Sequence, residues 1–338
     1  MKAVVLVGGE GTRLRPLTET VPKPLLPLVD RPILAHVLDH LVTHGVTEVI
    51  MSSPYLEETF HPFLESRGGR PAITWVTERK PLGTGGAVVS VLDRLGDEPF
   101  LALNGDILTD LDLTAMLDRH RSRGAAVTIA LHRVEDARAF GLVATDPTGL
   151  VTAFREKPPD PVPGDINAGT YVLDPSVLRR WDPGTYLWIE GEIFPSLIAE
   201  GVPMQGFGSD AYWLDLGTPE QYLSAHADLL AGRVAGHAYD APWIGSGARV
   251  DPSARVGRFV AIGPDARVEA GAEVDGTVLL PGSVVEEGAR VVRSVLGSRA
   301  TVGAGASLAG SVLGDGVRVG PGASLDGVRL GAADATRP

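Results

Sequence analysis

The chain has 338 residues, of which 44% are hydrophobic and 21% charged, a composition typical of globular proteins long enough for two domains. Its formal net charge of −12 argues against a nucleic-acid surface, which would need clustered Lys and Arg, and no apolar run approaches the roughly 18 residues of a membrane span. With no cysteine, the chain has no disulfide, thiolate nucleophile or Cys-based metal site.

The chain begins with a predicted strand over residues 2–7, which leads into the loop sequence GGEGTRLRPLTETVPKPLLP. The apolar stretch is too short for a signal peptide, so we expect a cytoplasmic protein. Gly8, Gly9 and Gly11 let backbone N–H groups approach phosphate oxygens. Arg13 and Lys23 add two cations that can hold a triphosphate. The loop is therefore predicted to bind a polyanion, although it is neither a P-loop nor GxGxxG.

The stretch GGEGTRLRPLT followed by PKP resembles the sugar-1-phosphate nucleotidyltransferases, also called NDP-sugar pyrophosphorylases. The resemblance implies an enzyme that joins a nucleoside triphosphate to a sugar 1-phosphate and releases pyrophosphate. It implies that Leu6 and Thr12, with the loop glycines and Arg13, contact the nucleotide. It also implies catalytic roles for Arg13, Lys23 and Asp106.

The next predicted element is a helix over residues 33–44, where His36, His40 and His44 share one face. That spacing can bind a metal ion, but the segment lacks the Glu of HExxH. We interpret these histidines as a partly exposed helix face.

Short apolar runs continue to alternate with amphipathic helical patterns as far as about residue 232. The predicted strands cover residues 48–53, 73–76, 100–103, 127–132 and 171–173, and the predicted helices cover residues 56–65, 85–95 and 114–123. This alternation predicts βαβ units, and therefore a Rossmann-like, mostly parallel sheet with flanking helices and ligands at the carboxyl ends of its strands. We expect a catalytic domain over residues 1–232.

The sequence TERKPLGTGGAV follows the predicted strand at residues 73–76. Glu78 is a candidate acceptor for donors on a nucleotide base, and Gly83, Gly85 and Gly86 suit a loop that lies against a flat ring. PLGTGGA is similar to the corresponding sequence of mannose-1-phosphate guanylyltransferases, as is the short repeat region described below. The resemblance therefore favours GTP and places Thr84 among the nucleotide contacts.

Two aspartates are candidate metal ligands. Asp106 follows Asn104 and Gly105 directly after a buried strand, where a carboxylate can reach a metal ion and a plain turn is the alternative. Asp215 precedes a helix whose N-cap is already supplied by Thr218. The resemblance implies that Asp106 and Asp215 bind Mg²⁺, which also holds phosphate oxygens, and that Asn104 and Gly105 contact the nucleotide.

The sugar-phosphate site is implied by the same resemblance. The residues assigned to it are Gly141, Glu156, Lys157, Asn167, Gly169 and Glu190. The chain departs from the family at Gly191, where a Lys or Arg often follows the glutamate. The identity of the sugar thus stays open, with glucose, heptose or cyclitol phosphates as alternatives to mannose 1-phosphate. The base stays open as well, with UTP, dTTP or ATP as alternatives to GTP.

After an expected linker over residues 233–243, aliphatic residues recur at a spacing of six. They are Ile244, Val250, Val256, Ile262, Val268, Val274 and Leu280. Hexapeptide repeats predict a left-handed parallel β-helix, expected over residues 244–330, with a tail over residues 331–338. We expect this β-helix to mediate a homo-oligomer, a dimer or tetramer, because its exposed faces and open end are natural packing surfaces.

Two other functional classes stay open. Hexapeptide β-helices often belong to acyltransferases, but these commonly use a histidine in the β-helix, and none follows His237. A non-catalytic, nucleotide-sugar-sensing subunit is the second alternative, although the charged motif residues are all present. The expected partners are a nucleoside triphosphate and a sugar 1-phosphate, and neither nucleic acid nor a membrane.

Overall fold

The structure of the protein, a computed structural model, describes residues 1–54 and 57–331. It contains two compact units that do not follow the chain in order. The first unit comprises Met1–Gly8 and Val37–Trp213, and the second comprises Gly9–His36 and the chain from Leu214 onward. The glycine-rich loop therefore belongs to the same unit as the C-terminal repeats.

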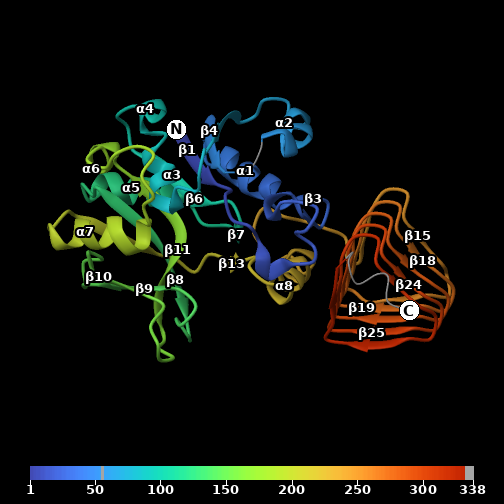
Figure 1. Cartoon of the computed structure of the whole chain (residues 1–338). Helices are drawn as coiled ribbons and strands as arrows, with labels where there is room; N and C mark the ends of the chain where they lie inside the picture. Colours follow the sequence, from blue (N-terminus) through green and yellow to red (C-terminus); the bar gives the residue numbers. More distant parts are fainter. Residues whose placement is uncertain (55–56, 332–338) are drawn as a thin grey trace. The chain divides into compact units, whose positions relative to one another are not determined.

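The first unit is built on a sheet of nine strands (Figure 1). They are β1 (Lys2–Leu6), β4 (Glu48–Ser53), β5 (Ala72–Thr77), β6 (Phe100–Asn104), β8 (Val127–Val134), β9 (Gly141–Thr145), β10 (Val151–Glu156), β11 (Gly164–Leu173) and β12 (Met204–Gly208). The main path runs in the order β10-β9-β11-β6-β1-β4-β5, with β8 and β12 beyond β11. β1 pairs in parallel with β4 and β6, whereas β11 is antiparallel to β6, β8 and β9.

This arrangement confirms the Rossmann-like fold class and shows that the sheet is mixed. Three strands were not predicted: β9, β10 and β12. β9 and β10 form a hairpin across a short turn in which Asp146 Oδ1 accepts from the backbone N of Thr148 and Leu150. A connection this short requires antiparallel pairing. The predicted strand at residues 171–173 is only the end of the ten-residue β11, whose earlier part contains the strand-disfavouring sequence Gly-Asp-Ile-Asn-Ala-Gly.

Eight α-helices lie in the described part of the chain. They are α1 (Ile33–Thr43), α2 (His61–Ser66), α3 (Gly83–Val89), α4 (Leu92–Leu95), α5 (Leu113–Ser122), α6 (Pro175–Leu178), α7 (Phe194–Ala199) and α8 (Pro219–Leu230). None of these described helices combines the length and apolarity that a membrane crossing needs.

Two helix predictions need correction. The helix predicted over residues 85–95 is wrong as one element, because α3 ends before Ser90 and α4 starts after Val91, whose φ of −115° leaves the helical region. Glycine and valine in α3 are weak helix formers, which explains its early end. The helix predicted over residues 56–65 begins at His61, after a 3₁₀ turn at Glu57–Thr59, and its first residue Leu56 lies outside the described residues.

The core of the first unit lies between the sheet and these helices. Phe100 on β6, Tyr171 on β11 and Phe194 on α7 are among its fully buried side chains. Each large apolar side chain buried in this way stabilises the fold by roughly 1.5–3 kcal/mol. The packing fixes β6 and β11 side by side, and these strands carry several candidate site residues.

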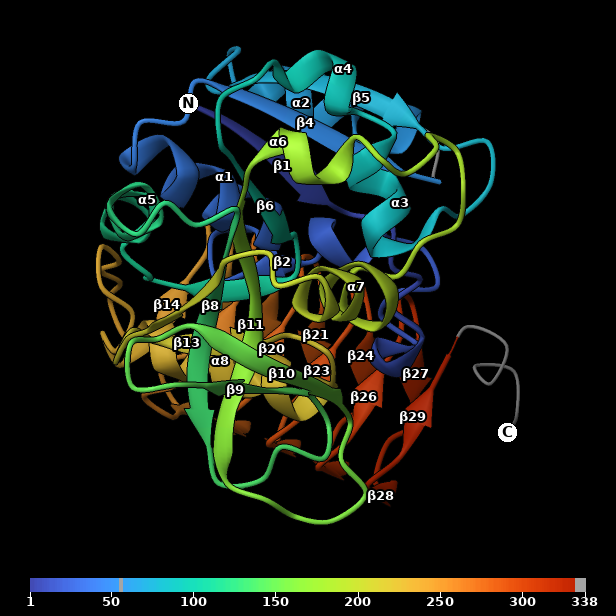
Figure 2. The same ribbon diagram turned by 90° about the vertical axis from the view of Figure 1, so that its left-hand side faces the viewer.

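The repeats of the second unit form three parallel sheets, consistent with the predicted left-handed β-helix (Figure 2). The first sheet contains β14 (Trp243–Ile244), β17 (Ala261–Ile262), β20 (Val278–Leu279), β23 (Val295–Leu296), β26 (Val312–Leu313) and β29 (Arg329–Leu330). The second contains β15 (Arg249–Val250), β18 (Arg267–Val268), β21 (Val284–Val285), β24 (Thr301–Val302) and β27 (Arg318–Val319). The third contains β16 (Arg255–Val256), β19 (Glu273–Asp275), β22 (Arg290–Val292), β25 (Ser307–Ala309) and β28 (Ser324–Asp326). Gly331 apart, the predicted tail over residues 331–338 lies outside the described residues.

The coils of the β-helix differ in length. Trp243 pairs with Ala261, eighteen residues later, whereas Ala261 pairs with Val278, only seventeen residues later. The spacing of six predicts that Leu280 points into the β-helix, and this prediction is wrong. Leu279 instead pairs with Ile262 and belongs to the apolar core of the β-helix.

Buried hydroxyl groups stabilise the shorter turn. Thr277 Oγ1 donates to Asp275 O at 2.8 Å and accepts from Ser294 N at 3.3 Å. Ser294 Oγ and Ser311 Oγ repeat this pattern one and two coils later. The three side chains form a continuous ladder that satisfies backbone groups inside the turns.

Two smaller strand pairs accompany the sheets. They involve β2 (Pro27–Leu28) and β3 (Arg31–Pro32), and β7 (Ile107–Thr109) and β13 (Trp213–Asp215).

Candidate active site

The glycine-rich loop of the second unit folds into two 3₁₀ turns, η1 (Thr12–Leu14) and η2 (Lys23–Leu25). Gly11 precedes η1 with a φ of 61°, a left-handed conformation that favours glycine. Thr18 Oγ1 donates to Gly11 O at 2.8 Å, and Leu14 is fully buried. These contacts hold the loop in one conformation.

Arg13 and Lys23 both face Asp215. Arg13 Nη2 lies 3.8 Å from Asp215 Oδ2, and Lys23 Nζ lies 3.7 Å from Asp215 Oδ1. The Lys23 side chain is only 7% exposed, whereas that of Arg13 is 67% exposed. A Cβ at Gly217 would lie 2.6 Å from Arg13 Nη2, so glycine leaves the space that the guanidinium occupies. Two segments that are far apart in the sequence, the glycine-rich loop and the residues before α8, thus form one charged cluster.

Among the other predicted nucleotide residues, Leu6, Glu78, Asn104 and Gly105 lie at or just after strand ends of the first unit, and Gly83 and Thr84 begin α3. Gly9 and Thr12 are exposed on the loop of the second unit. Gly105 N donates to Leu6 O at 2.9 Å, so the Asn-Gly-Asp turn packs against the end of β1. The half-buried Asp106 follows this turn directly. Gly8 lies two residues after the end of β1, and a Cβ there would approach Pro54 Cδ at 2.9 Å.

Glu78 is nearly buried, and both of its carboxylate oxygens accept hydrogen bonds. Ser52 Oγ donates to Oε1 and the backbone N of Leu82 donates to Oε2, each at 2.9 Å. Glu78 therefore fixes the loop that leads into α3. Each carboxylate oxygen retains acceptor capacity for a ligand.

The glycines of α3 have a structural role that the sequence did not indicate. The backbone N–H groups of Gly85 and Gly86 donate to Leu187 O at 3.0 and 3.1 Å. A Cβ at Gly83 would lie 2.5 Å from Leu187 O, and one at Gly86 would lie 2.3 Å from Thr185 O. The glycines let α3 pack directly on this backbone segment.

Three of the predicted sugar-phosphate residues meet where β9 and β10 pair. Glu156 lies opposite Gly141, and a Cβ at Gly141 would approach Glu156 Oε2 at 2.9 Å. Lys157 Nζ lies 3.3 Å from Glu156 Oε1 and its side chain is 63% exposed. The backbone of Lys157 has a φ of 42°, and its N–H donates to Phe140 O at 3.0 Å. The positive φ of Lys157 thus places its exposed ammonium group beside the Glu156 carboxylate.

The remaining predicted sugar residues belong to a hydrogen-bonded network around Tyr171, which sequence reasoning missed. Asn167 Nδ2 donates to Tyr171 Oη at 2.8 Å, and Tyr171 Oη donates to Glu190 Oε1 at 3.1 Å. Thr84 Oγ1 donates to Glu190 Oε2 at 3.0 Å, and Asn167 Oδ1 accepts from Gly169 N. The sequence signal that could have identified Tyr171 is its position four residues after Asn167.

Burial determines the electrostatics of this network. Desolvation raises the pKa of Glu190, and hydrogen bonds from Thr84 and Tyr171 oppose that rise only in part. Desolvation and the nearby Glu190 carboxylate raise the pKa of Tyr171 well above its usual value. Tyr171 is therefore a hydroxyl donor, and Glu190 is a carboxylate that is costly to ionise.

Trp213 was also missed. Its indole Nε1 donates to Ala168 O at 2.9 Å, and its ring packs against His132 and Phe140 with centroid distances of 5.1 and 5.5 Å. Trp213 thereby supports the Asn-Ala-Gly segment of β11, where a Cβ at Gly169 would lie 2.7 Å from Asn104 Nδ2.

The interpretation of the helix histidines needs correction. His36 is 3% exposed and its Nε2 lies 2.9 Å from Leu28 O, so it is a core residue and not part of an exposed face. Burial lowers its pKa to about 4. His44 Nδ1 lies 2.9 Å from Thr114 Oγ1. Over residues 1–54 and 57–331, no three His, Asp or Glu side chains gather as a metal site.

Comparison with known families decides the classification. A family model described as nucleotidyl transferase matches residues 2–232, and a model described as GMPPB C-terminal domain matches residues 239–331. The chain belongs to the nucleotidyl transferase family. This assignment confirms the family resemblance predicted from the loop motifs, and members of the family generally use a divalent metal ion.

Individual members of the nucleotidyl transferase family are similar over most of the chain. Mannose-1-phosphate guanylyltransferase of Mycobacterium tuberculosis is 40% identical over 287 residues, covering 83% of this chain and 80% of the relative. Mannose-1-phosphate guanylyltransferase 1 of Arabidopsis thaliana is 36% identical over 291 residues with the same coverage. The crystal structure of HddC from Yersinia pseudotuberculosis matches with a TM-score of 0.58 and 27% identity, covering 66% of this chain and 97% of that chain.

Proposed function

We propose that this protein is a mannose-1-phosphate guanylyltransferase, which converts GTP and mannose 1-phosphate into GDP-mannose and pyrophosphate. The observation that carries the proposal is the cluster of Arg13, Lys23 and Asp215 on the glycine-rich loop of a nucleotidyl transferase family member. The names of the relatives from M. tuberculosis and A. thaliana support this substrate pair. A second HddC structure, 26% identical, is titled as complexed with GMP-PN, which supports a guanine nucleotide.

The proposed reaction is an in-line displacement without a covalent enzyme intermediate. A phosphate oxygen of mannose 1-phosphate attacks the α-phosphorus of GTP, the bond from this phosphorus to the bridging oxygen breaks, and pyrophosphate leaves. Because the nucleophile is already an anion at neutral pH, the protein mainly aligns two polyanions and offsets their repulsion. Arg13 and Lys23 stabilise the charge on the departing pyrophosphate.

The residues around β9, β10 and β11 bind the sugar phosphate in this proposal. Lys157, whose side chain is exposed next to Glu156, holds the incoming phosphate. Glu156 accepts hydrogen bonds from sugar hydroxyls, and the Asn167–Gly169 segment of β11 exchanges hydrogen bonds with them. Glu190 acts on this pocket through Tyr171, which connects it to Asn167.

We propose that Asp106 and Asp215 hold a Mg²⁺ ion. Their carboxylate oxygens are the ligand type that Mg²⁺ prefers. Within the described residues no cage of three His, Asp or Glu side chains exists, so substrate phosphates and water would complete the coordination, as Mg²⁺ commonly requires. When bound, the ion supplies positive charge that neutralises phosphate oxygens.

A substrate panel tests the proposal. Pyrophosphate release is measured for GTP, ATP, UTP and dTTP, each combined with mannose, glucose or heptose 1-phosphate. We expect the highest kcat/KM for GTP with mannose 1-phosphate, and no turnover after Mg²⁺ is chelated. A preference for another pair would overturn the substrate assignment, and no release with any pair would favour the sensing subunit.

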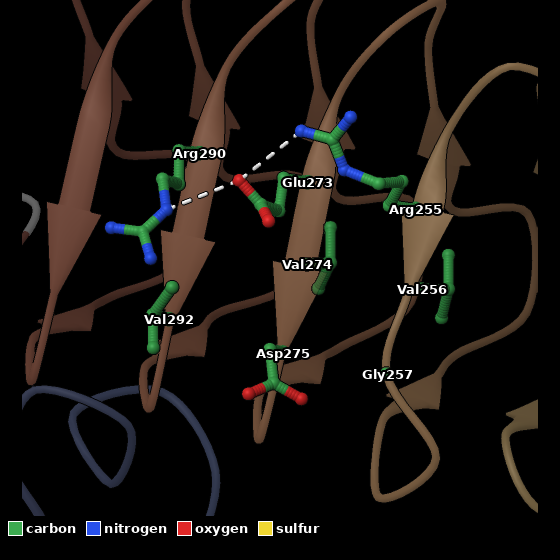
Figure 3. A pocket seen from close by; sticks show the side chains of 8 residues that line it. All are labelled: Arg255, Val256, Gly257, Glu273, Val274, Asp275, Arg290 and Val292. Carbon is green, nitrogen blue, oxygen red and sulfur yellow. Dashed lines mark hydrogen bonds and ion pairs between the residues drawn. The ribbon is translucent and has the colours of Figure 1, made fainter.

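We also propose that the enzyme is cytoplasmic and forms a dimer or tetramer through its β-helix. A shallow groove of about 440 Å³ lies on the sheet of β16, β19 and β22 (Figure 3). There Glu273 Oε2 lies 3.5 Å from Arg255 Nη2 and 3.2 Å from Arg290 Nε. An antiparallel second copy that is offset by one coil would place Arg255 of each copy opposite Glu273 of the other.

Light scattering tests the oligomer. The wild type is expected at two or four times the mass of the chain, and the double variant Arg255→Glu/Arg290→Glu is expected to shift toward monomer. The matched double variant Arg267→Glu/Arg318→Glu makes an equal change of charge on the neighbouring sheet and should leave the mass of the oligomer unchanged. A monomeric wild type would contradict the proposal.

A further inference from the structure

The last coil of the β-helix contacts the glycine-rich loop directly within the second unit. Thr20 Oγ1 donates to Asp315 Oδ2 at 2.7 Å, and the other oxygen of Asp315 accepts from Ser298 N at 2.8 Å. A Cβ on Gly314 would lie 3.1 Å from Pro16 Cβ, so the loop packs closely on this coil. The repeat region thus reaches the segment that carries the candidate catalytic cations.

Arg329, on the terminal strand β29, makes the most informative of these contacts. Its Nη1 donates to the backbone oxygen of Arg13 at 3.0 Å. Its Nη2 lies 3.5 Å from Glu220 Oε1, in the first turn of α8. One guanidinium therefore joins the two chain segments that carry Arg13 and Asp215, which lies five residues before Glu220.

The energetics of these contacts favour a geometric role. The side chains of Arg329 and Glu220 are 47% and 76% exposed, and exposed ion pairs contribute little to stability. Arg329 also lies outside the buried apolar core of the β-helix, whose members in this coil include Leu313 and Val319. The hydrogen bond to the Arg13 carbonyl, in contrast, fixes the backbone from which the exposed Arg13 side chain extends. A misplaced catalytic group can cost far more in rate than the contact contributes to folding.

We propose that Arg329 is a positioning residue for nucleotidyl transfer, which it supports by fixing the backbone of Arg13 relative to α8. The β-helix then has a second task besides the proposed assembly: its terminal coil completes the loop that binds the triphosphate. This inference rests on the proposed function, because it assigns Arg13 to the departing pyrophosphate.

Steady-state kinetics of pyrophosphate release test the proposal. The Arg329→Ala variant is expected to lose roughly tenfold in kcat/KM for GTP, while KM for mannose 1-phosphate stays within twofold of the wild type. Arg329→Lys, which can still donate to the Arg13 carbonyl, should recover much of the loss. Arg318→Ala removes an arginine from the start of β27 in the same coil and should behave as the wild type.

A double-mutant cycle separates positioning from general destabilisation. If Arg329 acts through Arg13, then Arg329→Ala should have almost no further effect in an Arg13→Ala background. Additive losses in the cycle, or wild-type kinetics of Arg329→Ala, would overturn the inference. Should Arg329→Ala unfold, Thr20→Val tests a second contact between the last coil and the loop, because it removes the hydroxyl bonded to Asp315. It is expected to show the same selective loss for GTP. If the proposed function is wrong, the wild type itself would not release pyrophosphate from GTP and mannose 1-phosphate, which distinguishes that outcome from a failure of the Arg329 proposal.

Discussion

Lys23 is the residue on which the candidate active site depends most. Its side chain is almost buried, and its ammonium group lies 3.7 Å from Asp215 Oδ1. A buried cation costs free energy unless it is paired, so this ion pair helps to keep the charge of Lys23 within the loop.

We expect Lys23→Ala and Asp215→Ala each to lower kcat by a hundredfold or more, because groups that stabilise charge in a transition state contribute about 3 kcal/mol. The measurement is pyrophosphate release under saturating substrates, with circular dichroism to confirm folding. Lys2→Ala is the matched control, since Lys2 forms a surface ion pair with Glu48 at 3.3 Å. Near-normal turnover of a folded Lys23→Ala variant would remove this residue from the proposed machinery.

We expect the buried Glu190 carboxylate to lower the stability of the protein while it supports activity. Burial raises its pKa, so the folded state binds a proton more tightly than the unfolded state and loses stability as pH rises through the unfolded and then the folded pKa. Glu190→Gln removes that cost, and we expect its melting temperature at pH 7 to exceed that of the wild type. The difference should shrink as pH falls toward 4, where the wild-type carboxyl is protonated. Activity should fall, because the amide no longer accepts from both Thr84 and Tyr171.

Thermal unfolding from pH 4 to pH 8, with turnover at pH 7, checks this expectation. Tyr171→Phe is the companion variant: it removes the hydroxyl between Asn167 and Glu190 but leaves the carboxylate in place. A Glu190→Gln variant that is less stable than the wild type at pH 7 would show that the hydrogen bonds outweigh the cost of burial.

At the scale of single residues, the sequence made Arg13, Lys23 and Asp215 candidates for the site but missed the neutral network. Arg13 and Lys23 became candidates because cations on a glycine-rich loop have few structural explanations. Tyr171 was not, because a tyrosine on a buried strand is ordinarily part of the core, and only the fold shows that its hydroxyl reaches Asn167 and Glu190.

The elements show where periodicity is sufficient and where it fails. A spacing of six predicted the β-helix because every inward position needs an aliphatic side chain. The change from eighteen to seventeen residues per coil was not predicted, because it depends on a buried hydroxyl in the turn. Similarly, the hydrophobic pattern over residues 85–95 fits one helix, but glycine and valine, which are weak helix formers, end α3 early.

The hydroxyl ladder itself carries a prediction for stability. Ser294 Oγ donates to Val292 O at 2.8 Å and accepts from Ser311 N at 3.1 Å, and the side chain is fully buried. Ser294→Ala should destabilise the protein by about 1–3 kcal/mol, because it leaves a buried N–H without this acceptor. Urea unfolding measures the difference. Ser324→Ala, on the exposed part of β28, should lie within about 0.5 kcal/mol of the wild type; equal losses in both variants would contradict the role of the ladder.

For the whole molecule, we expect two histidines buried in the second unit to contribute to the loss of stability in acid. Desolvation by burial lowers the pKa of His36 and of His226 to about 4. The unfolded chain therefore binds protons that the folded chain does not, and stability is lost as pH falls from about 6.5 to 4, on the order of 3 kcal/mol for each histidine.

His226 Nδ1 lies 2.9 Å from Tyr222 O, a contact that a Gln amide can replace. His226→Gln should thus cost some stability at pH 7.5 but weaken the loss between pH 6.5 and pH 4.5, as measured by urea unfolding at several pH values. An unchanged slope in this variant would mean that other groups control acid unfolding.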